Sequence, residues 1–332
     1  MKIVFMGTPD FAVPALKQLL AHHKVLAVCT QPDRRAGRGH KMQMSPIKTL
    51  ALSAGVEVLQ PETLLVKKSP KDEQTVRQNS DAKQARDYLA SLDADVFIVA
   101  AYGIILPKAV LTMPRHGCIN IHASLLPKYR GASPIHAAIK DGEIRTGITI
   151  MHMDTGIDTG DMILQQTLEI SPDERIQSLH DRMANLGGEC ILGALAQLEA
   201  GTATRTPQGD AASSYAPMIQ KSDAEIQWNW PASRIINLTR AFDPWPGPYT
   251  SYNGQQLKIW HIEKSEPTDS EDIDNESISP GTILAVDTTK GLKIRTGDGN
   301  AWILEMQTPG GKRMAVRDYL CGNEMRVGEV LG

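Results

Sequence analysis

The chain has 332 residues, a hydrophobic content of 41%, a charged content of 22% and a formal net charge of −3. This length predicts two domains, and the composition excludes a fibrous or largely disordered protein. The most apolar run, VFIVAAYGIILP from Val96, is shorter than the roughly 20 residues that cross a bilayer. Because the N-terminus also lacks the apolar segment of a signal peptide, we expect a cytoplasmic protein with no membrane partner.

The cysteines are scattered, without the paired spacing of a disulfide framework or of a metal site. Cys118 and His122 lie four residues apart, but a tetrahedral metal site needs a second pair of ligands that the sequence does not provide. We therefore expect reduced, packed thiols and no metal.

The first 200 residues alternate short apolar runs with helical patterns. Strands are predicted over residues 2–6, 24–30, 95–103 and 116–123, and a helix from about Phe11. Such alternation indicates βαβ units and an α/β fold with a Rossmann-like, mostly parallel sheet. The turn after the first strand, Gly7-Thr8-Pro9-Asp10, lacks two glycines of the dinucleotide-binding fingerprint, which argues against a dehydrogenase.

A helix is predicted to begin at Ser171-Pro172-Asp173-Glu174, where the serine can cap the first turn and the glutamate can complete a capping box. Two glycines at 187 and 188 weaken the next turn, so we expect this helix to end near Leu186 and a second helical segment to end near Ala200.

The composition changes after Gly201. Residues 201–217 are small and polar without apolar periodicity, and they predict a linker between a catalytic domain over 1–200 and a second domain over 218–332. In the second domain, short strand patterns such as QQLKIWHI and GLKIRT, separated by turns, predict a small all-β barrel. Polar stretches over 67–84 and 263–276 are expected to be exposed, and we assign them no function.

Asn120 and His122 lie in the predicted strand CINIH. Side chains two residues apart point to the same face of a strand, so these two project together while Ile119 and Ile121 pack on the other side. An amide and an imidazole at a strand end could stabilise an oxygen on which negative charge develops. They could equally be a buried polar pair that backbone groups satisfy.

The stretch MDTGIDTGDMI contains Asp154, Asp158 and Asp161 among glycines. A carboxylate in such a loop can reach a site, although Asp and Gly are also common turn residues. The acidic spacing does not match a calcium-binding EF-hand. Spacing alone does not choose among the three aspartates.

NIHASLLPKYRGASPI, followed by GIDTGD, resembles the signature of the folate-dependent formyltransferases, which use 10-formyltetrahydrofolate as formyl donor. GTPDFA, TQPDRRAGRG, AYGIILP and FDPWPGP narrow the resemblance to the members that formylate initiator methionyl-tRNA. The resemblance covers nearly the entire chain.

The resemblance implies that Asn120, His122 and Asp158 are the catalytic residues. It also implies two groups of folate-binding residues, one in the SLLP segment and one after the third predicted strand, although the second group could equally be core strand and loop. The folate-binding residues are Ser124, Leu125, Leu126, Pro127, Tyr102, Gly103, Ile104 and Leu106.

A pI near 6.3 argues against a general nucleic-acid binder, but residues 34–56 include five Lys or Arg residues and no acid. This segment could contact phosphates or could be an ordinary surface loop. The resemblance implies that this segment is a loop that binds the acceptor end of the tRNA, with Arg38 at the position that enters the acceptor end. It also implies that the C-terminal domain is an OB-like, tRNA-binding barrel. The expected tRNA contacts are Arg34, Arg35, Arg38, Lys41, Lys312 and Arg313.

The resemblance therefore implies an enzyme that formylates the α-amino group of methionine on initiator methionyl-tRNA for translation initiation. We expect a monomer, although the sequence itself does not determine the oligomeric state. Two rivals share the chemistry: formyltransferases of amino sugar nucleotides and of glycinamide ribonucleotide. A third possibility, a catalytically silent RNA-binding module, is disfavoured because all three chemical positions are present.

Overall fold

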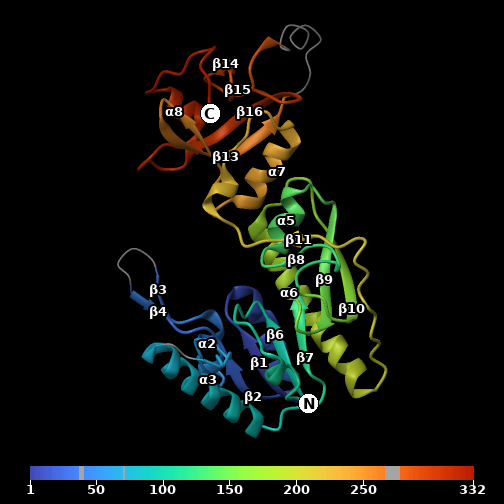
Figure 1. The fold of residues 1–332 in the computed structure, drawn as a ribbon. Coiled ribbons are helices and arrows are strands. Elements are labelled where there is room, and N and C mark those ends of the chain that lie inside the picture. Colours follow the sequence, from blue (N-terminus) through green and yellow to red (C-terminus); the bar gives the residue numbers. More distant parts are fainter. Residues whose placement is uncertain (37–40, 70–71, 266–276) are drawn as a thin grey trace. The chain divides into compact units, whose positions relative to one another are not determined.

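A seven-stranded sheet, in the order β10-β9-β7-β6-β1-β2-β5, is the centre of the first part of the protein (Figure 1). In the computed structural model, which describes residues 1–36, 41–69, 72–265 and 277–332, β1 pairs in parallel with β2 and β6, β6 with β7, and β2 with β5. The strands are β1 (Lys2–Gly7), β2 (Lys24–Cys29), β5 (Glu57–Leu59), β6 (Val96–Ala100), β7 (Cys118–His122), β9 (Arg145–His152) and β10 (Met162–Glu169). The predicted, mostly parallel α/β sheet is confirmed.

Three strands of this sheet, β5, β9 and β10, were not predicted. β9 pairs antiparallel with β7, with Asn120 opposite Met151 and His122 opposite Thr149. β10 follows β9 along the chain without a helix between them, so the alternation of strands and helices that marks the rest of the sheet breaks here. β9 ends opposite Ile119, near the start of β7, and the loop that follows β9 reaches Asn120 through the Asp158 side chain.

The described helices lie in both parts of the chain. They are η1 (Asp10–Ala12), α1 (Val13–His22), α2 (Pro46–Ser53), α3 (Glu73–Ser91), α4 (Lys108–Leu111), α5 (Pro134–Lys140), α6 (Ile176–Glu199), η2 (Lys221–Ala224), α7 (Ala232–Phe242) and α8 (Val316–Leu320). The polar stretch 67–84 contributes most of its residues to α3, which the Asp72 side chain caps by accepting a hydrogen bond from the Thr75 backbone N–H at 2.7 Å. Ala82 is buried, so the expectation that this stretch is exposed holds only in part.

The prediction of two helical segments between 171 and 200 was wrong, because α6 is continuous from Ile176 to Glu199. Its two glycines serve close packing instead of a break. A Cβ atom at Gly187 would lie 2.9 Å from Cγ2 of Ile121 in β7, and one at Gly188 would lie 3.2 Å from the backbone of Pro14 in α1. The start was also placed too early: Ser171 and Glu174 form a turn before the helix, in which the Ser171 N–H donates to the Glu174 carboxylate at 3.2 Å.

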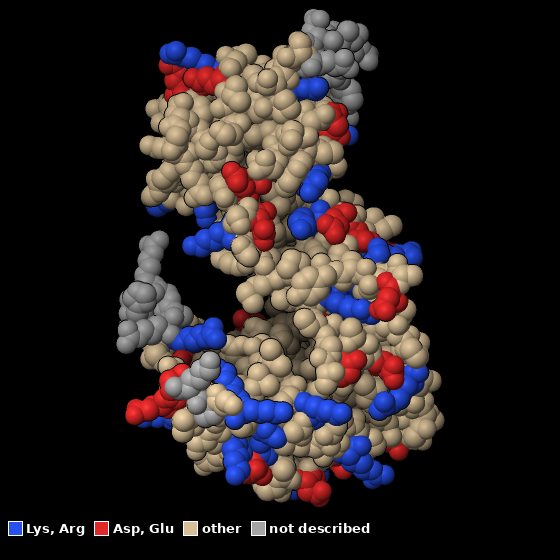
Figure 2. Space-filling model, in the orientation of Figure 1, with Lys and Arg blue, Asp and Glu red and all other residues tan. Residues whose placement is uncertain are grey.

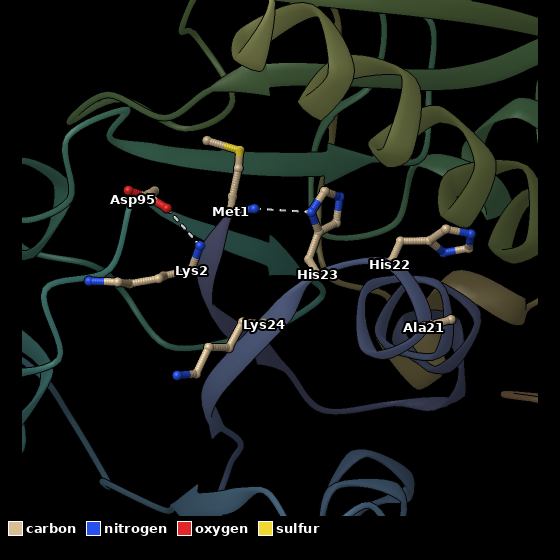
Figure 3. Close-up of a pocket in the computed structure, with 7 residues that line it drawn as sticks. All are labelled: Met1, Lys2, Ala21, His22, His23, Lys24 and Asp95. Carbon is tan, nitrogen blue, oxygen red and sulfur yellow. Dashed lines mark hydrogen bonds between the residues drawn. The ribbon is translucent and has the colours of Figure 1, made fainter.

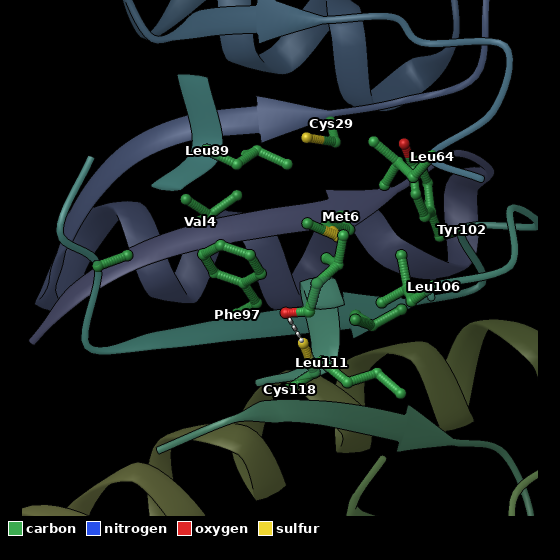
Figure 4. Close-up of a cluster of buried hydrophobic side chains, with 13 residues drawn as sticks. Val4, Met6, Cys29, Leu64, Leu89, Phe97, Tyr102, Leu106, Leu111 and Cys118 are labelled. Atoms are coloured by element: carbon green, nitrogen blue, oxygen red, sulfur yellow. Dashed lines mark hydrogen bonds between the residues drawn. The ribbon is translucent and has the colours of Figure 1, made fainter. Parts of the chain in front are cut away.

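One face of the parallel sheet packs into a hydrophobic core, shown in Figure 4, that includes Val4, Met6 and Phe97. All five residues of β6 are buried, as expected for a parallel strand covered on both faces. Cys29 and Cys118 are also part of this core, and burial raises the pKa of each thiol to about 12. They are therefore packed, protonated thiols, as the sequence predicts.

The second part of the chain contains an antiparallel sheet with the order β12-β13-β16-β15-β14, and β17 pairs with β16. The strands are β12 (Tyr249–Tyr252), β13 (Gln255–Lys264), β14 (Ile283–Asp287), β15 (Gly291–Thr296), β16 (Gly299–Gln307) and β17 (Met314–Ala315). The predicted antiparallel β domain is confirmed, and its closure into a barrel stays a prediction. Most of the acidic stretch 263–276 lies outside the described residues.

The chain divides into two compact units, one of residues 1–131, 146–169 and 180–215, the other of residues 132–145, 170–179 and 216–332. Most of the segment 201–217, predicted as a linker, thus packs with the first unit, and α5 packs with α7 in the second. The expected domain boundaries stay predictions. Within the described residues, no helix has the length and apolar character needed to cross a membrane.

The packing of α6 on β7 predicts opposite effects for two glycine-to-alanine substitutions in the same helix. Gly187→Ala should lower stability by about 1 to 3 kcal/mol, because the new methyl group overpacks against Ile121. Gly193→Ala, whose Cβ would lie an ordinary 3.7 Å from Leu164, should be neutral or stabilise by about 0.5 to 1 kcal/mol. Thermal unfolding midpoints of both variants test this; equal shifts would refute the role assigned to Gly187.

Candidate active site

The site is built at the carboxyl end of β7, beside the carboxyl end of β6, where open parallel sheets place their ligands. Asn120 and His122 share one face of β7, and Ile119 and Ile121 are buried on the other. Asn120 is half-buried and His122 is 4% exposed. The strand thus presents an amide and an imidazole at its end, as the alternation predicts.

Asp158, in the loop between β9 and β10, reaches both of these side chains. Its Oδ1 accepts a hydrogen bond from Nδ2 of Asn120 at 3.3 Å, and its Oδ2 lies 3.6 Å from Nδ1 of His122. Oδ2 also accepts a hydrogen bond from the backbone N–H of Gly131 at 2.8 Å. The structure therefore brings the three predicted catalytic residues together around one carboxylate.

The other two aspartates of this loop are engaged elsewhere. Oδ1 of Asp154 accepts hydrogen bonds from the Gly156 N–H at 2.9 Å and from the Thr159 hydroxyl at 2.7 Å, which close a local turn. Asp161 faces Arg205 at 3.9 Å. The choice that spacing left open is made by these partners, because only Asp158 has its carboxylate directed at β7.

His122 has an acceptor beside each ring nitrogen. Nε2 lies 2.9 Å from the backbone oxygen of Tyr129, and Nδ1 faces Asp158. A carbonyl oxygen can only accept, so Nε2 carries the hydrogen of that bond. The protonated imidazole could then donate from both nitrogens, and the longer contact leaves the Nδ1 edge free to turn toward a substrate oxygen.

His152, at the end of β9, is the neighbouring histidine of the same sheet. Burial, together with the nearby charge of Arg205, lowers its pKa to about 4. His152 is consequently neutral near pH 7, so it does not supply a second positive charge to this end of the sheet.

Three residues around the site have left-handed backbone conformations that are unusual for residues other than glycine. These are Ala101 (φ 47°) after β6, Tyr129 (φ 60°), and Asp158 (φ 52°). Such conformations cost about 1 to 3 kcal/mol each and persist only where surrounding contacts enforce them. At Tyr129 and Asp158 these conformations accompany the contacts that hold His122 and Asn120.

The SLLP segment after β7 is held by hydrogen bonds from β9 and β10. Thr149 donates to the Ser124 oxygen at 2.6 Å and accepts from the Leu126 N–H at 3.1 Å, and Gln165 donates to the Leu126 oxygen at 2.9 Å. The Ser124 hydroxyl donates to the Lys128 oxygen at 2.6 Å, so it is used within the loop. Sequence reasoning missed Thr149 and Gln165, which belong to the unpredicted strands.

Leu125 and Pro127 are the half-buried members of this segment, and Leu126 is buried. Ser124 is fully buried as well. The surface that the segment offers a ligand therefore comes from Leu125, Pro127 and the backbone, and folate binding by all four residues stays a prediction.

The predicted folate neighbours after β6 divide into core and surface. Tyr102 and Leu106 belong to the hydrophobic core in Figure 4, whereas Gly103 is exposed and Ile104 is half-buried. The backbone oxygen of Tyr102 accepts hydrogen bonds from the Thr8 hydroxyl and from the Gln31 side-chain amide, both at 3.0 Å. Gly103 has φ +74°, and a Cβ atom there would collide with Gln31. The backbone near Gly103 is thus the part of this segment that a ligand can reach.

The basic segment is not a simple loop. β3 (Arg34–Ala36) and β4 (Lys41–Gln43) pair antiparallel, and α2 begins at Pro46 after the Ser45 cap. Arg34 is exposed, which suits contact with phosphate. The side chains of Arg35 and Lys41, and the whole of Arg38, lie outside the described residues, so their predicted roles are not tested.

Lys48, the fifth basic residue of this segment, has two protein partners. Its Nζ lies 2.6 Å from Oδ2 of Asp33 and 2.7 Å from Oε1 of Gln60, and the Gln60 amide donates to Oδ1 of Asp33 at 2.8 Å. Its side chain is 16% exposed. Lys48 therefore braces the base of β3 and β4. The acid at 33, directly before the basic run, is the signal in the sequence that could have indicated this.

The two basic residues predicted in the second unit have different surroundings. Lys312 is exposed. Arg313 donates to both carboxylate oxygens of Asp243, at 3.0 and 3.1 Å, and to Glu305 at 2.6 Å. These bonds from Asp243 and Glu305 outweigh the effect of burial and raise the pKa of Arg313. Arg313 thus holds the FDPWPGP segment in place, which leaves Lys312 as the better candidate for contact with RNA.

Charged side chains are mixed over the surface. In Figure 2, Lys and Arg lie over the part that holds β1, β2 and β6 in Figure 1, with acidic side chains among them. A surface depression, drawn in Figure 3, is lined by Met1, Lys2, His22, His23, Lys24 and Asp95 at the amino ends of β1 and β2. It lies at the opposite edge of the sheet from Asn120 and His122, so it is not the site described above.

Known proteins resemble this chain in sequence and in fold. The formyl transferase family matches residues 1–195, and the C-terminal domain of formyl transferases matches residues 218–324. The chain is 46% identical over 332 residues, all of both chains, to the methionyl-tRNA formyltransferase of Caldanaerobacter subterraneus subsp. tengcongensis.

Two solved structures show the same fold at low identity. An N-formyltransferase from Helicobacter canadensis, in complex with folinic acid and dTDP-3-aminofucose, is 19% identical with a TM-score of 0.63, over 91% of this chain and 98% of that one. HypX from Aquifex aeolicus, in complex with tetrahydrofolic acid, is 18% identical with a TM-score of 0.58 over 96% of this chain. This chain spans 47% of HypX.

The family match covers more than half of the sequence and the bacterial relative matches from end to end. This chain belongs to the formyl transferase family, among its methionyl-tRNA formyltransferases.

Proposed function

We propose that the chain transfers the formyl group of 10-formyltetrahydrofolate to the α-amino group of methionine on initiator methionyl-tRNA. The observation that carries this proposal is the Asp158 carboxylate placed between Asn120 and His122, in a chain that matches a methionyl-tRNA formyltransferase along its whole length. The bound folates of the two structural neighbours are consistent with a folate donor.

The reaction begins when the neutral amine attacks the formyl carbon. A C–N bond forms, and the carbonyl electrons move to the oxygen, which becomes an oxyanion. In this proposal the Asn120 amide and the Nδ1–H of His122 donate hydrogen bonds to that oxygen. Collapse of the intermediate breaks the bond to the folate nitrogen, which takes up a proton as it leaves.

Asp158 has two roles in this scheme. Its Oδ2 lies 3.6 Å from Nδ1 of His122 and can accept a hydrogen bond from that nitrogen, and its carboxylate can take the proton that the attacking amine loses, directly or through one water. The Gly131 N–H keeps Oδ2 in place during both steps. No covalent enzyme intermediate is needed, because the amine itself is the nucleophile.

The folate would bind at the carboxyl ends of β6 and β7. The exposed Gly103 and the half-buried Leu125 and Pro127 would provide polar and apolar contacts to it. Hydrogen bonds from Thr149 and Gln165 hold the SLLP segment before a ligand arrives, which reduces the entropy that binding must remove.

The tRNA would be positioned by phosphate contacts from the basic segment at 34–41 and from Lys312. The chain has a net charge of −3, so attraction is local to these residues and not a property of the whole surface. The rival acceptor is an amino sugar nucleotide, because the Helicobacter canadensis neighbour is in complex with one.

The experiment that tests the function measures formyl transfer from 10-formyltetrahydrofolate to three acceptors: initiator methionyl-tRNA, the same tRNA without methionine, and an amino sugar nucleotide. We expect product with the charged tRNA alone. Product with the sugar alone would retain the chemistry at Asn120, His122 and Asp158 but refute the tRNA assignment.

Removing either charged member of the site should stop catalysis without unfolding the protein. We expect His122→Ala and Asp158→Asn each to lower kcat by at least about 100-fold, since each removes a group needed in the transition state. Asp154→Asn, in the same loop but directed at a local turn, is the matched control and should retain most activity. Near-normal turnover in His122→Ala or Asp158→Asn would eliminate this mechanism.

Arg38→Ala should weaken the use of tRNA much more than that of folate. Loss of one phosphate contact should raise KM for methionyl-tRNA about tenfold and reduce its salt dependence, with KM for folate unchanged. Steady-state kinetics at two salt concentrations measure both effects. An equal loss for the two substrates would point to a damaged fold and contradict the assignment.

Lys48→Met should also raise KM for methionyl-tRNA, through loss of the brace and not of a phosphate contact. The variant keeps the aliphatic stem but leaves the Asp33 carboxylate without its cation. If the brace explains the effect, Asp33→Asn should produce a similar rise in KM, because it removes the carboxylate that Lys48 faces and leaves the lysine itself in place. A rise in Lys48→Met with unchanged or improved KM in Asp33→Asn would instead make Lys48 a direct contact.

A further inference from the structure

Residues 206–214, within the segment predicted as a linker, contact the residues that hold Asp158 and His122. We propose that Gln208 is a positioning residue for the formyl transfer, which fixes the loop of Asp158, and that Arg130 orients Gln208. This inference rests on the proposed function, because it assigns Gln208 a part in the same reaction.

The Gln208 side chain uses its whole amide. Its Nε2 donates to the backbone oxygens of Asp158 at 2.9 Å and Gly160 at 2.8 Å, and its Oε1 accepts from Nε of Arg130 at 3.1 Å. Only the amide nitrogen can donate to two carbonyls, and only the amide oxygen can accept from a guanidinium. These partners therefore determine the orientation of the amide.

Arg130 and its neighbour Gly131 hold Asp158 from two ends. The Gly131 N–H donates to the Asp158 carboxylate at 2.8 Å, while the Arg130 side chain orients the amide that donates to the Asp158 carbonyl. Asp158 has a left-handed backbone with φ 52°. Both contacts favour this conformation, which directs the carboxylate at Asn120 and His122.

The same segment also contacts the residue that holds His122. Ser214 accepts a hydrogen bond from the Tyr129 N–H at its hydroxyl and from the Arg130 N–H at its carbonyl, both at 2.9 Å. The Tyr129 carbonyl in turn accepts from His122. Tyr129 is the second left-handed residue of the site, so residues 208 and 214 each support one strained position.

The segment is itself fixed before Gln208. Thr206 and Met162 exchange backbone hydrogen bonds, both at 2.9 Å, and Arg205 faces Asp161. Because Met162 begins β10, the segment is tied to the sheet on one side of Gln208 and to the loop after β7 on the other. Gln208 thus acts from a fixed backbone, as a positioning group requires.

Two substitutions separate donation from packing. Gln208→Met keeps the length and most of the volume but donates nothing, and Gln208→Glu keeps the shape and the partner for Arg130 but replaces the donor by an acceptor. If Gln208 positions Asp158, both variants should lower kcat about 10- to 100-fold, because a displacement near 1 Å at a catalytic group has such an effect. KM for folate should change by less than about twofold, since the folate contacts lie elsewhere.

Thr204→Ala, at an exposed position of the predicted linker 201–217 just before this segment, is the matched control and should retain full activity. The assay measures kcat and KM for the folate in formyl transfer to methionyl-tRNA, together with the thermal unfolding midpoint of each variant. Turnover of both Gln208 variants within about twofold of the unchanged chain would overturn the inference. A loss in kcat that is matched by a similar loss in folate affinity would also overturn it, because that is the result of a disordered site.

If neither Gln208 variant folds, Arg130→Met supplies the same test, since it removes the guanidinium that orients the amide and leaves residue 208 intact. We expect the same selective loss of kcat, and unchanged turnover would refute the proposal. Failure of the unchanged chain to formylate methionyl-tRNA would refute the proposed function itself, so the two failures are distinguishable.

Discussion

The position of one carboxylate, that of Asp158, is the constraint on which the site depends. It must face β7 closely enough to receive the Asn120 amide at 3.3 Å and to lie 3.6 Å from the His122 imidazole. The backbone of Asp158 has a left-handed conformation, φ 52°, which is strained for a residue other than glycine and needs surrounding contacts to persist. The structure therefore has to hold Asp158 from several directions, through Gly131 at the side chain and Gln208 at the carbonyl.

The fold supplies these contacts because of the way the sheet ends. β7 has a parallel neighbour on one side and the antiparallel β9 on the other, and the loop that follows β9 contains Asp158, which contacts Asn120 and His122. The segment after β7 contains Tyr129 and Gly131. The Tyr129 carbonyl accepts a hydrogen bond from His122, and the Gly131 N–H donates to Asp158. α6 can pack against the apolar side of β7 because residue 187 has no side chain.

Much of this could be predicted from the sequence. Alternation within CINIH was enough to place Asn120 and His122 on one face, and the continuous apolar runs indicated a parallel sheet. The choice of Asp158 could not be made from the residues alone, because it depends on Asp154 being used by a turn and Asp161 facing Arg205. Gln208 was hidden for a similar reason: a polar residue in an aperiodic stretch is indistinguishable from linker until its partners are known. In α6 the two glycines favoured a break, but packing overrode local propensity.

A crystal structure of this protein with a folate that carries a formyl group but does not transfer it, such as 5-formyltetrahydrofolate, would test the central claim most directly. The account predicts that the folate binds at the carboxyl ends of β6 and β7, and that its formyl group lies beside Asn120 and His122, with a heavy-atom separation of about 3 Å from the Asn120 amide to the formyl oxygen. Asp158 should keep its contacts with Gly131 and Gln208. A folate bound elsewhere, for example in the depression beside Met1 and His23, or an Asp158 turned away from β7, would contradict it.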